Sequence, residues 1–125
     1  MTICYCGNHL PFENCCQPYI KGLTKAPTAE ALMRSRYSAY ATGDADYLIA
    51  TTHISTRKLH KKKDIMAWSQ SNHWCRLEIL KVTPTTVTFK AHYIDNHRKE
   101  QIHHEKSNFI LENGNWFYVD GSYTF

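Results

Sequence analysis

Four of the five cysteines of this chain lie within its first sixteen residues, and no other feature constrains the fold as strongly. They form two close pairs separated by an eight-residue loop: Cys4 and Cys6, then Cys15 and Cys16. The loop contains Gly7 and Pro11, which are turn-forming residues that allow the chain to double back. Four thiolates brought together in this way supply the tetrahedral set used by structural zinc sites. The spacing therefore predicts one structural zinc ion, closed by four protein ligands.

Other interpretations of these cysteines stay open at this point. Disulfides between the two pairs, or free thiols, are compatible with the same spacing, and His9 is an alternative ligand. The residues before Cys4 contain neither a basic start nor an apolar run, so they do not resemble a signal peptide. We therefore expect a cytoplasmic protein, in which clustered cysteines bind metal more often than they form disulfides.

The segment Cys4-Tyr5-Cys6-Gly7, completed by Cys15-Cys16, resembles the SEC-C zinc motif found at the C-terminus of the SecA translocation ATPase. Asn8-His9-Leu10 stands where that motif commonly has Ser-Gly-Lys. The resemblance implies that the same four cysteines bind metal here. In SecA the motif engages the SecB chaperone and the ribosome, so the resemblance also implies a protein or ribosomal partner.

Three further segments are similar to the YchJ-like family of uncharacterised bacterial proteins: 26–40 (APTAEALMRSRYSAY), 104–109 (HEKSNF) and 116–121 (WFYVDG). The family implies a zinc knuckle, residues 1–22, followed by a domain of the nuclear-transport-factor-2-like fold, residues 27–125. In that fold a curved antiparallel sheet wraps around a helix and encloses a cone-shaped space. The family implies no established activity.

The residue pattern itself also predicts an α+β fold. Three helices are expected, the first capped by Thr28 and stopped by Gly43, at 28–43, 44–52 and 64–69. Four strands rich in β-branched and aromatic residues follow, at 74–82, 85–95, 101–111 and 116–123. Asn113-Gly114 is a strong hairpin signal between the last two strands. The basic run 57–63 is expected to be a solvated face.

Charge and hydropathy argue against two classes of partner. The formal net charge of +4 falls to about +2 when four thiolates and one zinc ion are counted, which is too small to indicate nucleic-acid binding. The chain has no apolar run of about 18 residues, so no membrane-spanning helix is expected. The fifth cysteine, Cys75, follows Trp74 and is expected to be a small buried side chain.

A sheet curved around a helix leaves a pocket, which is the default location for a small ligand. The residues expected to line it are Arg36, Tyr37, Tyr40, Trp74, Tyr93, Glu105, Trp116 and Asp120. Arg36 lies within the apolar stripe of the first helix, so it either pairs with a carboxylate, Glu105 first and Asp120 second, or extends its head into water. Glu105 is the candidate acid or base, because burial raises the pKa of a carboxyl group. Adjacent His103 and His104 point to opposite strand faces, so they are not expected to share a metal.

Three functions are compatible with these observations. The first is a binding or adaptor module whose knuckle contacts a protein or ribosomal partner, supported by a closed metal site and the lack of a catalytic motif. The second is an enzyme or ligand binder that uses the cone pocket with Glu105. The third is a purely structural domain. We favour the first, and the fold alone does not choose among them.

Overall fold

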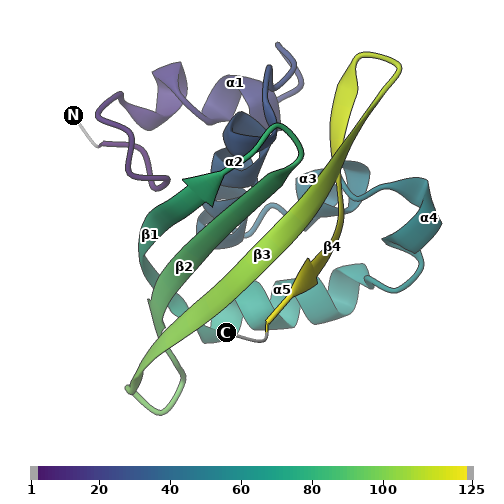
Figure 1. Cartoon of the computed structure of the whole chain (residues 1–125). Helices are drawn as coiled ribbons and strands as arrows, with labels where there is room; N and C mark the ends of the chain where they lie inside the picture. Colours follow the sequence, from purple (N-terminus) through teal and green to yellow (C-terminus); the bar gives the residue numbers. More distant parts are fainter. Residues whose placement is uncertain (1–2, 124–125) are drawn as a thin grey trace.

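The computed structural model describes residues 3–123. At its centre is an antiparallel sheet in which each strand pairs with the next along the chain: β1 (His73–Val82), β2 (Thr86–Ile94), β3 (Glu100–Glu112) and β4 (Asn115–Ser122). The helical elements are η1 (Phe12–Asn14), α1 (Gln17–Ile20), α2 (Ala29–Thr42), α3 (Ala45–Ala50), α4 (Ile54–Arg57) and α5 (Lys62–Ser71). Helices α2, α3 and α5 lie behind the sheet (Figure 1). The predicted α+β fold is confirmed.

Helix α2 is the element against which the sheet packs. It begins after Thr28, whose Oγ1 accepts a hydrogen bond from a first-turn amide at 3.0 Å. It ends at Gly43, whose φ of 77° suits a residue without a Cβ atom. Leu32 on its buried face lies in the same core as Phe89 of β2. Both predicted ends of this helix are confirmed.

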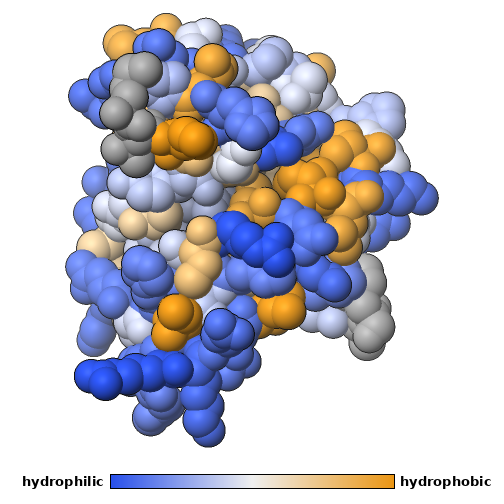
Figure 2. Space-filling view, turned by 90° about the vertical axis from the view of Figure 1, so that its left-hand side faces the viewer, coloured by the Kyte–Doolittle hydropathy of each residue, from blue (hydrophilic) through white to orange (hydrophobic). Residues whose placement is uncertain are grey.

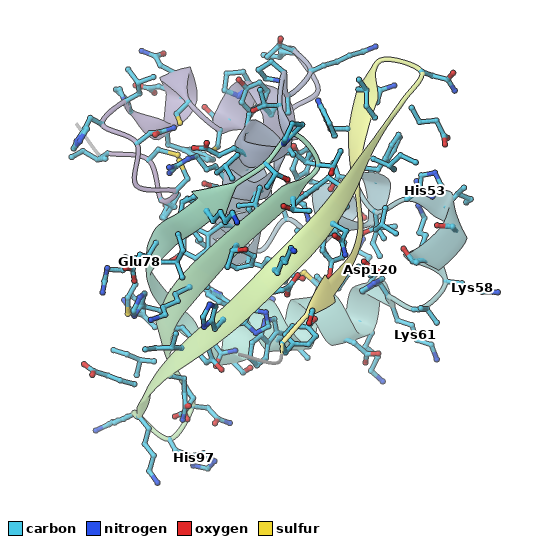
Figure 3. The ribbon with its side chains drawn as sticks, viewed as in Figure 1. His53, Lys58, Lys61, Glu78, His97 and Asp120 are labelled. Carbon is cyan, nitrogen blue, oxygen red and sulfur yellow. The ribbon has the colours of Figure 1, made fainter. Side chains whose placement is uncertain are left out.

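The other elements lie close to their predicted bounds. Helix α5 begins and ends two residues outside the predicted range, and each strand end differs by no more than one residue. Helices α1 and α4 were not predicted, because four residues each are too few to show a helical period. Lys58 and Lys61, from the basic run around α4, are exposed and project from the body of the protein (Figure 3).

A bulge in the edge strand β1 changes the direction of Cys75. Trp74 pairs with Tyr93 and Arg76 pairs with His92, so Cys75 is an extra residue in β1. A bulged residue leaves the regular alternation of the strand. Cys75 is exposed, and its predicted burial is wrong.

The N-terminal segment packs against the same core as the sheet. Cys4, Cys6 and Cys16 are 4%, 0% and 1% exposed and belong to the cluster that contains Leu32 and Phe89. This core contains residues from both sides of the predicted boundary, and the division into 1–22 and 27–125 stays a prediction. Residues 1–2 and 124–125 lie outside the described part. Within residues 3–123, no helix has the length and apolar composition of a membrane-spanning segment.

Candidate functional site

The four predicted metal ligands come together at the N-terminal end of the fold. The Sγ atoms of Cys4, Cys6, Cys15 and Cys16 all lie within 4.8 Å of one another. The Sγ atom of Cys15 is 3.6 Å from that of Cys6 and 3.9 Å from that of Cys16. Thiolates placed about 2.3 Å from a tetrahedral zinc ion are about 3.8 Å apart, so these side chains fit the ion. All five cysteines, which the structure describes, are free of disulfides.

Backbone hydrogen bonds fold the loop between the two cysteine pairs. The Cys4 amide donates to the Leu10 carbonyl at 2.8 Å, and the Gly7 amide donates to the Cys4 carbonyl at 3.1 Å. Gly7 has a φ of 91°, which glycine adopts without strain. Nη1 of Arg34, on α2, donates to the Cys6 carbonyl at 2.7 Å. The loop is therefore fastened to the helix that forms the main core.

The thiols alter one another's affinity for protons. The pKa of Cys4 is lowered because the thiols of Cys16 and Cys6 hydrogen-bond to its sulfur. The pKa of Cys16 is raised chiefly because its thiol hydrogen-bonds to Cys4 and, to a smaller extent, because it hydrogen-bonds to Cys6. Asn8 Nδ2 donates to Cys15 Sγ at 3.6 Å, from outside the cluster. A metal ion binds thiolates, so it would take the place of the protons that the cluster shares.

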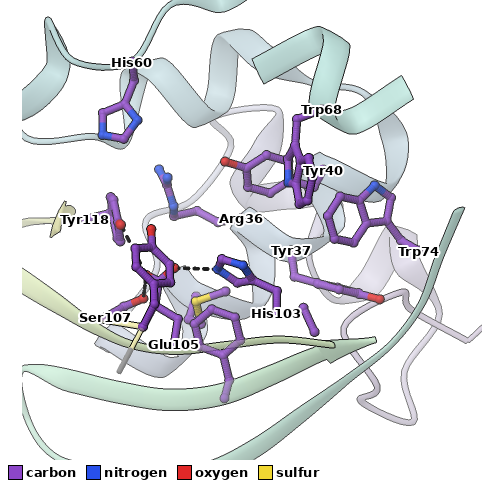
Figure 4. Close-up of a pocket in the computed structure, with 14 residues that line it drawn as sticks. Arg36, Tyr37, Tyr40, His60, Trp68, Trp74, His103, Glu105, Ser107 and Tyr118 are labelled. Carbon is purple, nitrogen blue, oxygen red and sulfur yellow. Dashed lines mark hydrogen bonds and ion pairs between the residues drawn. The ribbon is translucent and has the colours of Figure 1, made fainter. Parts of the chain in front are cut away.

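A cavity of about 230 Å³ lies between α2, α5 and the inner face of the sheet (Figure 4). Five of the residues that were predicted to line it are found there: Arg36, Tyr37, Tyr40, Trp74 and Glu105. The structure adds polar and aromatic residues that the sequence analysis did not assign to it, notably His60, Trp68, His103, Ser107, Tyr118 and Tyr123. The cavity is aromatic around α5 and polar between α2 and β3.

Arg36 is buried, at 6% exposure, but its partners are not the predicted ones. Its Nη1 donates to the Leu48 carbonyl at 2.9 Å and to Thr51 Oγ1 at 2.7 Å. Its guanidinium carbon lies 4.5 Å from the centre of the Tyr118 ring. Across residues 3–123, no carboxylate forms an ion pair with it. The predicted pair with Glu105 or Asp120 is wrong, because Nη1 bonds to oxygens at the C-terminal end of α3 and both carboxylates have other partners.

Glu105 is held by three donors on the sheet. Oε1 lies 2.8 Å from His103 Nε2, while Oε2 accepts hydrogen bonds from Ser107 Oγ and, at 3.2 Å, from Tyr118 Oη. Burial alone raises the pKa of this carboxyl, but the bonds from His103 and Ser107 outweigh it and leave the pKa below its ordinary value. This direction is opposite to the one expected from the sequence. Glu105 is therefore an ionised group that orients its neighbours.

His103 lines the cavity although it was not predicted to do so. It stands two residues before Glu105 on β3, so both side chains point to the same face of the sheet. Its Nε2 contacts the carboxylate, which leaves Nδ1 as its second polar atom. The alternation of His103, Glu105 and Ser107 in the sequence was the available signal, since residues at i, i+2 and i+4 share a face.

Three predicted lining residues lie elsewhere, and Tyr93 and Trp116 are two of them. The Tyr93 ring packs against Trp68 and Trp74, with centroids 5.3 and 5.2 Å away, and supports these two cavity residues without lining the cavity itself. Trp116 pairs with Leu111 near the β3–β4 turn, and its Nε1 donates to the Pro27 carbonyl at 3.3 Å. It lies too far along β4 to reach the cavity.

Asp120 is turned away from the cavity by a bulge in β4. Phe109 pairs with Tyr118 and Asn108 pairs with Asp120, so Val119 is an extra residue. Regular alternation would have placed Asp120 on the face of Tyr118. Instead it lies on the outside of the sheet, where its Oδ1 accepts a hydrogen bond from Asn108 Nδ2 at 2.8 Å (Figure 3).

A curved α+β domain with a four-cysteine cluster packed at its N-terminal end defines a SEC-C motif protein with a nuclear-transport-factor-2-like domain. The family described as YchJ, middle NTF2-like domain, matches residues 28–121. The UPF0225 protein of Enterobacter sp. (strain 638) is 38% identical over 96% of this chain and 82% of its own length. The UPF0225 protein YchJ of Shigella dysenteriae serotype 1 is 36% identical over the same shares. This chain belongs to the YchJ (UPF0225) family.

Two solved structures share the whole fold. The solution structure of a SEC-C motif containing protein from Rhodopseudomonas palustris superposes with a TM-score of 0.90 at 34% identity, over 99% of this chain and 100% of that one. The crystal structure of a SEC-C motif containing protein from Psychrobacter arcticus gives 0.83 at 29% identity, over 100% and 84%. The cysteine cluster and these relatives together indicate that the chain binds metal.

Proposed function

We propose that this protein is a zinc-stabilised binding module whose N-terminal knuckle docks onto another protein. The observation that carries the zinc assignment is the set of four Sγ atoms within 4.8 Å, three of them on buried cysteines. Four soft sulfur ligands select zinc over hard cations such as magnesium or calcium. The set has no open position, so the ion holds the fold and does not take part in a reaction.

The knuckle presents apolar side chains around this metal cluster. Ile3, Tyr5 and Leu10 are 57%, 43% and 53% exposed. Figure 2 shows hydrophobic side chains in the upper part of one face, at the height of the N-terminal segment in Figure 1. The isolated bridge between Ile3 and Pro11 holds the two ends of the loop side by side. A rigid loop with exposed apolar side chains suits a protein surface, such as that of a ribosomal protein, better than a nucleic acid.

Serine substitutions distinguish the contribution of the metal to partner binding from the contribution of the exposed apolar side chains. Ile3→Ser with Leu10→Ser removes exposed apolar area but no metal ligand, so it should keep one zinc per chain and lose the partner. Leu59→Ser with Leu111→Ser is the matched control, because these leucines are 73% and 54% exposed but lie outside the knuckle. Cys4→Ser with Cys6→Ser should lose both the metal and the partner.

The partner is to be identified by cross-linking and mass spectrometry, then purified and titrated against each variant by calorimetry. The proposal requires that the wild type and the leucine control bind it with equal affinity. The Ile3 and Leu10 variant should bind at least about tenfold more weakly, a change of about 1.4 kcal/mol. Equal binding by all zinc-loaded variants would show that the knuckle surface is not the docking site.

A further inference from the structure

The cavity contains a buried cation, Arg36, that forms no ion pair within residues 3–123. Arg36 is 6% exposed, and its Nη1 donates to one carbonyl oxygen and two hydroxyl oxygens. Within residues 3–123 its hydrogen bonds to protein atoms all run through Nη1, which leaves Nη2 and Nε without a protein acceptor, and no carboxylate forms an ion pair with it. An ionised group removed from water is costly unless an opposite charge meets it. This side chain is therefore arranged to receive an anion.

The nearest carboxylate of the cavity is already occupied. Both oxygens of Glu105 are engaged, by His103 on one side and by Ser107 and Tyr118 on the other. In Figure 4 the dashed bonds join Glu105 to the sheet side of the cavity, while the Arg36 guanidinium points into the open space toward His60. Glu105 is held by its own donors and leaves the free edge of Arg36 available.

The opposite end of the cavity is an aromatic wall. The ring of Trp74 lies 5.7 Å from that of Tyr40 and 5.8 Å from that of Trp68. Trp68 is 39% exposed and Tyr123 is 60% exposed, so the cavity reaches the surface between α5 and the end of β4. Such a wall accepts an apolar or aromatic group and has no charge with which to bind a second ionic group.

We propose that this cavity binds a small organic monocarboxylate, with its carboxylate on the free edge of Arg36 and its apolar body against Tyr40, Trp68 and Trp74. The guanidinium presents Nη2 and Nε side by side, which matches the two oxygens of a carboxylate. A volume of about 230 Å³ restricts the ligand to a compact molecule with one ring or a short branched chain. This inference goes beyond the docking role of the knuckle and does not depend on it.

The test uses the full, zinc-loaded chain and three probes: benzoate, its neutral analogue benzamide, and acetate, which lacks the apolar body. Calorimetry should show saturable one-to-one binding of benzoate that is at least about tenfold tighter than binding of benzamide or acetate. Arg36→Met should abolish the preference for benzoate over benzamide. Lys58→Met removes an exposed positive charge outside the cavity and should leave benzoate binding unchanged.

A second measurement covers the case in which Arg36→Met does not fold. In the wild type labelled with ¹⁵N-arginine, benzoate should shift the side-chain Nε–H resonance of Arg36, and benzamide should not. Equal affinities for benzoate and benzamide, an unshifted Arg36 resonance at saturation, or no binding of benzoate would each overturn the proposal. Loss of partner docking in the knuckle variants with benzoate binding retained would leave it standing, so the two proposals fail separately.

Discussion

The side chain of Glu105 occupies the space that a Cβ atom on Gly121 would need. A methyl group built at position 121 overlaps the Glu105 carboxylate and lies 2.8 Å from its Cγ. Gly121 pairs with Ser107, which is on the same face of β3 as Glu105, so the glutamate side chain crosses over the strand pair at that point. The φ of Gly121 is outside the left-handed region, so its backbone conformation does not require a glycine. The lack of a Cβ atom is required because the Glu105 side chain occupies that space.

Gly121→Ala should therefore lower the free energy of unfolding by about 1–3 kcal/mol, as is typical of overpacking a filled site. The matched control is the same change in a Glu105→Ala background, where the overlapping side chain is gone and the added methyl should cost much less. Urea melts of the two single variants and the double variant give the coupling energy. Equal costs of Gly121→Ala in both backgrounds would contradict the contact.

Thr51 is the closest partner of the Arg36 guanidinium. Its Oγ1 accepts from Arg36 Nη1 at 2.7 Å and donates to the Tyr47 carbonyl at 2.7 Å. Thr51→Val keeps the shape of the side chain but removes a hydrogen bond to a buried charge, so it should cost about 1.5–3 kcal/mol. Thr42→Val is the control, because the hydroxyl of Thr42 bonds only to carbonyls of its own helix. Equal losses of unfolding free energy for the two variants in chemical denaturation would contradict the role of Thr51 as a partner of Arg36.

The ionised state of Glu105 predicts a pH dependence of stability. Burial raises the pKa of its carboxyl, but hydrogen bonds from His103 and Ser107 lower it by more, so the folded pKa lies below the unfolded value. A group with a lowered folded pKa stabilises the protein above its unfolded pKa, and that contribution disappears as the pH falls through the folded pKa. The wild type should therefore exceed Glu105→Gln in unfolding free energy most at pH 6 and progressively less below pH 4.5. Urea melts over this pH range test the prediction. A difference in unfolding free energy between the two proteins that stayed constant or grew on acidification would contradict it.

The features that local sequence determines were predictable. Thr28 and Gly43 set the ends of α2 through a cap and a left-handed residue, and each acts within its own turn. The cysteine spacing brought four ligands into one short segment, so no long-range pairing had to be known. The strands followed from their β-branched and aromatic runs, and their ends were correct to within one residue.

The features that depend on register were not predictable. The bulges at Cys75 and Val119 reverse the direction of neighbouring side chains, and neither carries a sequence signal as strong as a turn glycine. Arg36 Nη1 bonds to the Leu48 carbonyl of α3 and to the Thr51 hydroxyl just after it, and these uncharged partners are not predicted by pairing opposite charges. His103 joins the cavity because β3 presents it beside Glu105, a fact that required the face of the strand to be known.

Removal of metal should affect the whole chain, because the cysteines share a core with the sheet. Cys4, Cys6 and Cys16 are packed with Leu32 and Phe89 in one cluster. We expect a strong chelator to lower the thermal midpoint by at least about 5 °C, equivalent to about 1 kcal/mol for a domain of this size, in a single transition. Circular dichroism and tryptophan fluorescence should give the same midpoint. Two separate transitions would show instead that the knuckle unfolds by itself, as the boundary between 1–22 and 27–125 predicts.

Elemental analysis of freshly purified, unchelated protein tests whether Cys4, Cys6, Cys15 and Cys16 hold one zinc ion. One equivalent of zinc per chain is expected in the wild type, and less than about a tenth in Cys4→Ser with Cys6→Ser. Cys75→Ser is the control, because this exposed cysteine lies outside the cluster and its loss should leave one equivalent in place. A wild type that carries less than about a tenth of an equivalent of zinc, or that carries another metal in stoichiometric amount, would contradict the claim.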